Sequence, residues 1–216
     1  MPRETFVTGG TGYIGSRLIP LLASRGHRVR ALVRPGSEGR LPAGCARVTG
    51  DPLRLETFAS GVAPADAFVQ LVGVPHPSPA KAAQFREIDL ASAKASSEAA
   101  ARTGVAHFIY VSVAQPAPAM KEYQAARAEA ESFVRASGLN ATFLRPWYVL
   151  GPGHRWPYLL VPFYAIAELL PPTREAARRI GLVTLAQMLR ALVWSVENPA
   201  RGIRILDVPG IRASRI

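Results

Sequence analysis

Glycines near the start of the chain constrain its fold more than any other feature. Residues 9–15 read Gly-Gly-Thr-Gly-Tyr-Ile-Gly, between a short apolar run at 5–8 and apolar residues at helical spacing over 16–24. Glycines at these positions allow a tight turn from strand to helix, close approach of the backbone to a pyrophosphate, and packing of the helix on the strand. A glycine-rich turn without a ligand is the alternative. The predicted dinucleotide site here comprises Gly9, Thr11, Gly12, Tyr13, Ile14 and Gly15.

Strand and helix patterns alternate up to residue 146. Helical patterns, the longest over 81–102 and 120–136, separate apolar, β-branched runs that predict strands at 5–8, 27–33, 46–49, 67–72, 107–111 and 141–144. This alternation predicts an α/β fold, a doubly wound parallel sheet of the Rossmann type. The rhythm breaks after Pro146, before a helix near 184–196 and a last strand near 203–208. We expect residues 1–146 to form the dinucleotide-binding domain and 147–216 a small C-terminal lobe or lid packed on it.

The end of the second predicted strand indicates which dinucleotide binds. NAD-binding folds usually place an acidic residue there, where it bonds the ribose 2′-hydroxyl. This chain has Arg34 instead, followed by Pro35 and Gly36, with no carboxylate before Glu38. A guanidinium pairs well with a 2′-phosphate, so we expect NADP(H) in preference to NAD(H). Arg30 either shares this task or is an outward-facing strand residue.

Composition excludes several other classes of protein. The net charge is +11, but the arginines are scattered rather than run together, so nucleic-acid binding is only an outside alternative and no such partner is expected. Cys45 is the one cysteine, which fits a reducing cytoplasm. The longest apolar stretch, 156–170, contains two prolines and falls short of the ~20 residues of a membrane span. No cluster has metal-ligand spacing, so no metal is expected.

Several motifs in order resemble the short-chain dehydrogenase/reductase superfamily, in its extended and atypical branch of NAD(P)H-binding, epimerase-like proteins. Besides the glycine turn, they are Val-Thr-Gly-Asp at 48–51, Phe-Val-Gln-Leu-Val-Gly at 68–73, Phe-Ile-Tyr-Val-Ser at 108–112, and Leu-Arg-Pro at 144–146 with Gly-Pro-Gly at 151–153. The resemblance implies that the carboxylate at 51 contacts the adenine and that the later loops line the ribose, phosphates and nicotinamide. The cofactor-binding residues it implies are Asp51, Pro52, Val72, Gly73, Val74, Val111, Tyr123 and Pro146.

The catalytic set of this family is matched only in part. Its active members use Tyr-x-x-x-Lys on the helix after the fifth strand and a Ser or Thr just past that strand. The lysine lowers the phenol pKa, so that the tyrosine exchanges a proton with a carbonyl or alcohol. Here Tyr123 is kept, Arg127 replaces the lysine and Val113 stands at the Ser/Thr position, with Ser112 one residue early and facing the opposite way. Tyr123 and Arg127 are therefore the candidate catalytic residues, unless Tyr123 only faces the cofactor.

Other residues are weaker candidates. His76, in a proline-rich loop, and His154, after the sixth predicted strand, are either proton donors or solvated loop histidines. A group of aromatic residues forms either an apolar substrate pocket or the core of the lid: Trp147, Tyr148, Trp156, Tyr158, Phe163 and Tyr164.

The sequence favours an NADPH-binding oxidoreductase that acts on a small, apolar carbonyl or quinone-like acceptor. A non-catalytic NADP(H) sensor or assembly protein is the first alternative, because Val113 and Arg127 interrupt the catalytic set and the stretch 156–170 offers a partner surface. A nucleotide-sugar epimerase or dehydratase is the second, although the C-terminal lobe is short for such substrates. Whether the chain forms a homo-oligomer stays open.

Overall fold

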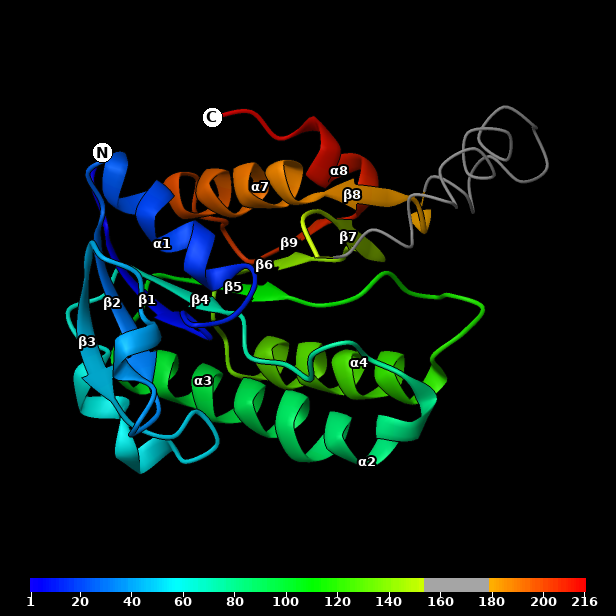
Figure 1. Ribbon diagram of the computed structural model, residues 1–216, viewed down its shortest axis with the longest axis horizontal. Coiled ribbons are helices and arrows are strands. Elements are labelled where there is room, and N and C mark those ends of the chain that lie inside the picture. The colour runs from blue at the N-terminus through cyan, green and yellow to red at the C-terminus, as the bar shows by residue number, and fades with distance from the viewer. Residues whose placement is uncertain (154–178) are drawn as a thin grey trace.

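A parallel sheet forms the centre of the protein (Figure 1). The computed structural model describes residues 1–153 and 179–216. Within these residues the main sheet has seven strands in the order β3-β2-β1-β4-β5-β6-β9. They are β1 Glu4–Thr8, β2 Arg28–Val33, β3 Cys45–Thr49, β4 Ala67–Gln70, β5 His107–Val111, β6 Ala141–Leu144 and β9 Ile203–Leu206. All neighbouring pairs are parallel, which confirms the predicted doubly wound Rossmann fold.

Helices cover both faces of the sheet, as Figure 1 shows. One layer holds α1 Gly15–Ser24, α7 Leu185–Glu197 and α8 Val208–Ala213. The other holds α2 Ala82–Gln84, α3 Ala91–Arg102 and α4 Lys121–Ala136, with a π-helical segment, Phe85–Leu90, joining α2 to α3. Short 3₁₀ turns also lie at Glu38–Arg40, Leu55–Thr57, Ala59–Gly61 and Pro79–Lys81.

Burial on both faces explains why the central strands are almost continuously apolar. Along β5, Phe108 and Tyr110 join the core beneath α3 and α4, whereas Ile109 joins the core beneath α1 and α7. Side chains alternate in this way because successive residues of a strand point to opposite faces. The carboxyl end of each strand is therefore held rigidly between two packed layers.

The C-terminal elements divide between the main sheet and a small second one. β9 pairs with β6 and extends the main sheet, while β7 Tyr148–Leu150 pairs in parallel with β8 Leu182–Thr184. A capping box starts α7, since Thr184 Oγ1 accepts from Gln187 N and the Gln187 side chain accepts from Thr184 N. The predicted helix near 184–196 and strand near 203–208 are confirmed. The boundary at 146 stays a prediction.

Part of the sequence prediction lies outside the described residues, namely the stretch 156–170 and the candidates His154, Trp156, Tyr158, Phe163 and Tyr164. No helix within 1–153 and 179–216 is long and apolar enough to cross a membrane. Over the same two ranges, no group of His, Cys, Asp and Glu side chains is arranged to hold a metal ion.

Candidate functional site

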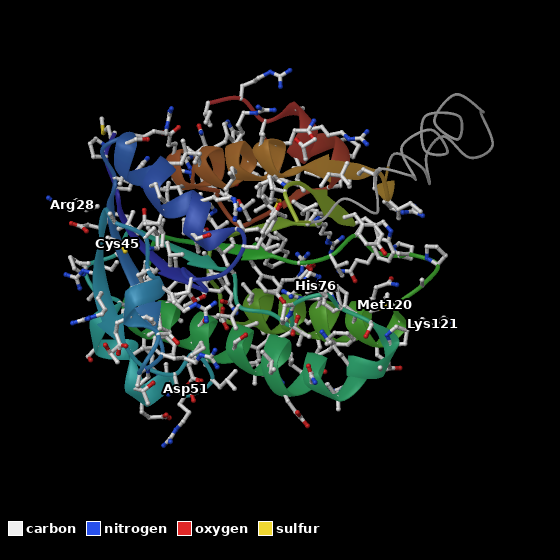
Figure 2. The ribbon with its side chains drawn as sticks, in the orientation of Figure 1. Arg28, Cys45, Asp51, His76, Met120 and Lys121 are labelled. Atoms are coloured by element: carbon white, nitrogen blue, oxygen red, sulfur yellow. The ribbon has the colours of Figure 1, made fainter. Side chains whose placement is uncertain are left out.

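The predicted cofactor-binding segments meet at one edge of the sheet. The strands are parallel, so the segments that follow β1 to β6 all emerge where the strands end. The strand order reverses between β1 and β4, and the helices that follow these two strands cover opposite faces of the sheet. This place is the switch point of the sheet, and open α/β sheets bind their ligands just outside it. Figure 2 shows His76, Met120 and Lys121 toward this side of the molecule, opposite Arg28 and Cys45 at the starts of β2 and β3.

The glycine turn has the geometry that its sequence predicts. Gly9 has φ +71°, and the Gly12 amide donates to the Gly9 carbonyl at 3.0 Å. A Cβ on Gly9 would lie 2.9 Å from the Leu71 carbonyl carbon, and one on Gly15 would overlap the Gly9 oxygen. No side chain caps α1 and no acidic residue lies in its first turn. The first amides of the helix are therefore suited to bind a pyrophosphate.

Tyr13 connects the turn to the segment after β6. The Arg17 guanidinium lies 4.6 Å from the centre of the Tyr13 ring, and its Nη1 donates to the Tyr13 carbonyl at 2.8 Å. A Cβ on Gly151 would overlap the Tyr13 hydroxyl. Thr11 and Ile14 lie in the same turn, before the first residue of α1. The glycine at 151 thus lets β7 approach the turn closely.

Arg30, within β2, and Arg34, just after it, have different environments. Arg30 Nη1 donates to the carbonyls of Gly61 and Ala63 at 3.2 and 2.6 Å, so this side chain is held by backbone oxygens. Arg34 is exposed just after β2. At the end of β3, Asp51 Oδ1 accepts from the Leu53 amide at 3.0 Å, which orients the carboxylate beside Pro52. That Arg34 contacts the cofactor stays a prediction.

Substitution of Gly12 tests the turn directly. A Cβ there would lie 3.1 Å from the Gly9 oxygen, so Gly12→Ala is expected to fold after a small shift. The methyl group would stand where the phosphates approach, and we expect the dissociation constant of NADPH to rise at least tenfold, about 1.4 kcal/mol. Isothermal titration calorimetry measures this change. Gly39→Ala is the control, because nothing lies within 4 Å of its Cβ position, and it should bind as the unaltered chain does.

Arg127 lies in a buried ion pair that sequence reasoning missed. Its Nη2 is 2.5 Å from Asp89 Oδ1, and the two side chains are 7% and 0% exposed. Its Nη1 donates to the Val111 carbonyl at 2.7 Å and to the Tyr110 hydroxyl at 3.2 Å. The other oxygen of Asp89 accepts from the Val74 amide at 2.9 Å. A single carboxylate between Ile88 and Leu90 in a helical pattern was the only signal in the sequence.

Tyr123 lies one helical turn before Arg127 on α4. Its ring is 4.9 Å from that of Phe85, and the Arg127 guanidinium is 5.1 Å from its centre. Burial raises the pKa of the Tyr123 phenol by more than the charge of Arg127 lowers it, and Asp89 raises it further. Burial also raises the pKa of neighbouring Tyr110 to about 12. The arginine therefore does not produce a phenolate at neutral pH, and Tyr123 carries its proton.

Ser112 and Val113 are both buried past the end of β5. Ile109 and Val111 face the α1 side of the sheet, so alternation turns Ser112 toward the α4 side. Ser112 Oγ makes no hydrogen bond with any of the described residues. Pro146, buried after β6, accepts from the Ala114 amide at 3.0 Å and fixes the loop that follows these residues.

Gln70 belongs to the motif at 68–73, but the sequence did not single it out. It is fully buried as the last residue of β4, where its Oε1 accepts from Thr8 Oγ1 and, at 3.1 Å, from the Val72 amide. Its Nε2 donates to Ser92 Oγ at 3.0 Å. Gln70 thus connects the residue before the glycine turn to the loop after β4. A polar residue inside an apolar strand pattern is the signal that points to it.

His76 is exposed in the loop after β4 and has φ +48°. Lys81 Nζ donates to the carbonyls of Pro75 and His76 at 2.6 and 3.1 Å, which holds this loop in place. Of the aromatic candidates, Trp147 and Tyr148 are half-buried at the start of β7, with ring centres 5.6 Å apart.

A glycine turn at the switch point of a doubly wound parallel sheet defines the class of Rossmann dinucleotide-binding proteins. The chain belongs to the NAD(P)H-binding family, which matches residues 9–155, and within it resembles the extended, epimerase- and dehydratase-like short-chain dehydrogenases/reductases. The predicted family is thereby confirmed.

Three relatives illustrate the range of this similarity. A ceramide reductase of Caulobacter vibrioides is 28% identical over 202 residues, which cover 91% of this chain and 62% of the relative. An uncharacterized sugar epimerase, YhfK of Bacillus subtilis, is 31% identical over 66% of this chain and 71% of its own length. A farnesyl-dihydroquinoline-oxide ketoreductase of Stigmatella aurantiaca is 27% identical over 68% of this chain and 51% of its own length. The chain thus spans 51–71% of the length of these curated relatives.

Solved structures share the fold at low sequence identity. WbmH of Bordetella bronchiseptica, in complex with NAD⁺, superimposes with a TM-score of 0.71 at 21% identity, over 96% of this chain and 76% of that one. The dTDP-glucose 4,6-dehydratase DesIV of Streptomyces venezuelae superimposes with a TM-score of 0.71 at 20% sequence identity. The match covers 95% of this chain and 75% of DesIV. These likenesses support the fold assignment alone.

Proposed function

We propose that this chain is an NADPH-dependent reductase of a small, apolar carbonyl or quinone-like acceptor. The observation that carries the proposal is the position of Tyr123 on α4, at the same edge of the sheet as the glycine turn. Burial, which raises the pKa of its phenol, favours the protonated form. Two of the relatives are named as reductases, of a ceramide and of a quinoline-oxide ketone. A raised phenol pKa suits reduction, since this direction requires a proton donor.

Most of these residues bind the cofactor, and one of them donates a proton to the substrate. The turn from Gly9 to Gly15 binds the pyrophosphate through amides, Asp51 and Pro52 contact the adenine end, and Arg34 pairs with the 2′-phosphate. The remaining cofactor contacts come from Val72, Gly73, Val74, Val111, Tyr123 and Pro146. When bound, NADPH supplies the hydride. The Tyr123 hydroxyl donates the proton to the oxygen of the reduced carbonyl.

The test of this function is NADPH consumption by the purified chain with a panel of ketones, aldehydes and quinones. Acceptor-dependent oxidation, with a stoichiometric alcohol or quinol product, is expected for at least one compound class. Tight NADPH binding without oxidation across the panel would instead favour the alternative of a non-catalytic sensor or assembly protein. That alternative draws support from Arg127, which is paired with Asp89, and from buried Val113 at the Ser/Thr position.

Arg34 determines the preference for NADPH in this proposal. Arg34→Ala is expected to weaken NADPH binding about tenfold and to leave NADH binding unchanged, because only NADPH carries the 2′-phosphate. Fluorescence titration with each dinucleotide measures the ratio. Arg28→Ala is the matched control, since Arg28 is an exposed arginine at the start of the same strand and lies well away from Asp51 in Figure 2. Equal weakening for both dinucleotides would contradict the assignment.

A further inference from the structure

The position of the family's lysine holds a buried ion pair that proton donation by Tyr123 does not use. Asp89 and Arg127 come from the π-helical segment and from α4, and their side chains are almost completely buried. The carboxylate balances the charge of the guanidinium at 2.5 Å. Arg127 therefore does not act as an unpaired cation at the edge of the sheet.

This pair contacts two of the segments assigned to the cofactor. On one side, Asp89 Oδ2 accepts from the Val74 amide at 2.9 Å, and a Cβ on Gly73 would overlap Arg127 Nη2. On the other side, Arg127 Nη1 donates to the Val111 carbonyl at 2.7 Å. The loop after β4 and the end of β5 are thus attached to the same guanidinium and carboxylate.

The shape of a guanidinium explains why arginine serves here. Its planar fork presents donors in fixed directions, so that separate nitrogens reach Asp89 and the Val111 carbonyl. Nη1 also reaches the Tyr110 hydroxyl at 3.2 Å. A lysine ammonium is a compact point charge on a flexible stem and does not span these partners. The change from lysine to arginine therefore fits the presence of a buried carboxylate partner.

We propose that Asp89 and Arg127 form a positioning pair that holds the loop after β4 and the end of β5 in the shape that binds NADPH. The inference rests on the proposed function for the identity of the ligand. The pair acts through backbone groups, since the Val74 amide donates to Asp89 and the Val111 carbonyl accepts from Arg127. Arg127 is therefore a positioning residue rather than a catalytic one.

The experiment replaces both partners by apolar residues, so that no buried charge is left unpaired. The Asp89→Leu/Arg127→Met variant is expected to keep its circular dichroism and cooperative unfolding. Its NADPH dissociation constant should rise at least tenfold, and the Val74 amide should exchange with deuterium faster, with or without NADPH. The control is Glu98→Leu/Arg102→Met, which removes an exposed pair within α3 and should change neither measurement.

The outcomes separate this inference from the proposed function. A folded double variant with unchanged NADPH affinity and Val74 exchange would overturn the positioning pair. If the double variant does not fold, Arg127→Lys decides: weakened NADPH binding by a folded protein supports the inference, and unchanged binding overturns it. Binding without turnover in the unaltered chain would remove the reductase activity while leaving the positioning pair intact. Failure of the unaltered chain to bind NADPH would overturn both.

Discussion

Replacement of Tyr123 by phenylalanine is expected to lower kcat for carbonyl reduction by at least ~10²-fold, the effect typical of losing a general acid. The substitution keeps the aromatic ring and its contact with Phe85, 4.9 Å between ring centres. NADPH affinity and unfolding temperature should therefore change little. Steady-state kinetics at saturating NADPH, together with a direct binding titration, separate the loss of proton donation from a loss of cofactor.

The pH profile provides an independent measurement on Tyr123. Burial raises the pKa of its phenol above the ordinary tyrosine value of about 10. The proton-donating form therefore persists as pH rises, and the alkaline loss of kcat should begin only above that value. Lys121→Ala, at the exposed start of the same helix, is the control and should keep the rate and the profile. Undiminished turnover by the phenylalanine variant would remove Tyr123 from the mechanism.

Replacement of Glu131 by glutamine is expected to destabilise the fold by about 3 kcal/mol, the lower end of the range for breaking a buried ion pair. Glu131 is 3% exposed and accepts from Arg145 Nε at 2.9 Å and Nη2 at 2.5 Å. It also accepts from Gln115 Nε2 at 3.1 Å. The expected loss of stability lies at the lower end of that range because the Arg145 side chain is itself 20% exposed to solvent. The carboxylate joins α4 to the segments after β5 and β6.

Chemical denaturation followed by circular dichroism gives the free energy of unfolding for this comparison. The matched control is Glu98→Gln, which removes an exposed helical pair with Arg102 and should cost less than about 0.5 kcal/mol. Equal losses in the two variants would show that burial of the Glu131 carboxylate contributes nothing beyond an ordinary surface pair. Loss of Glu131 should also loosen the segment that carries Pro146, which a modest rise in the NADPH dissociation constant would report.

Local spacing accounts for what the sequence alone predicted. The glycine turn, the six strands up to residue 144 and the segment containing Tyr123 and Arg127 were all readable, because each depends on residues close together along the chain. The NAD(P)H-binding family and the Rossmann fold follow from the same short patterns in their order. The long predicted helix at 81–102 was only partly right, since the structure divides it into a 3₁₀ turn, α2, a π-helical segment and α3.

Contacts between distant segments were decided by the tertiary structure. Asp89 and Arg127 are 38 residues apart and meet only because α4 packs against the π-helical segment. Gln70 likewise joins Thr8, just before the glycine turn, to Ser92 on α3. β9 extends the main sheet by pairing with β6, where Ala141 lies beside Ile203. The sequence by itself determined that a dinucleotide turn follows β1. The tertiary structure decided that the arginine in the lysine position is paired and that Tyr123 keeps its proton, because burial and charge partners depend on the packing of the whole fold.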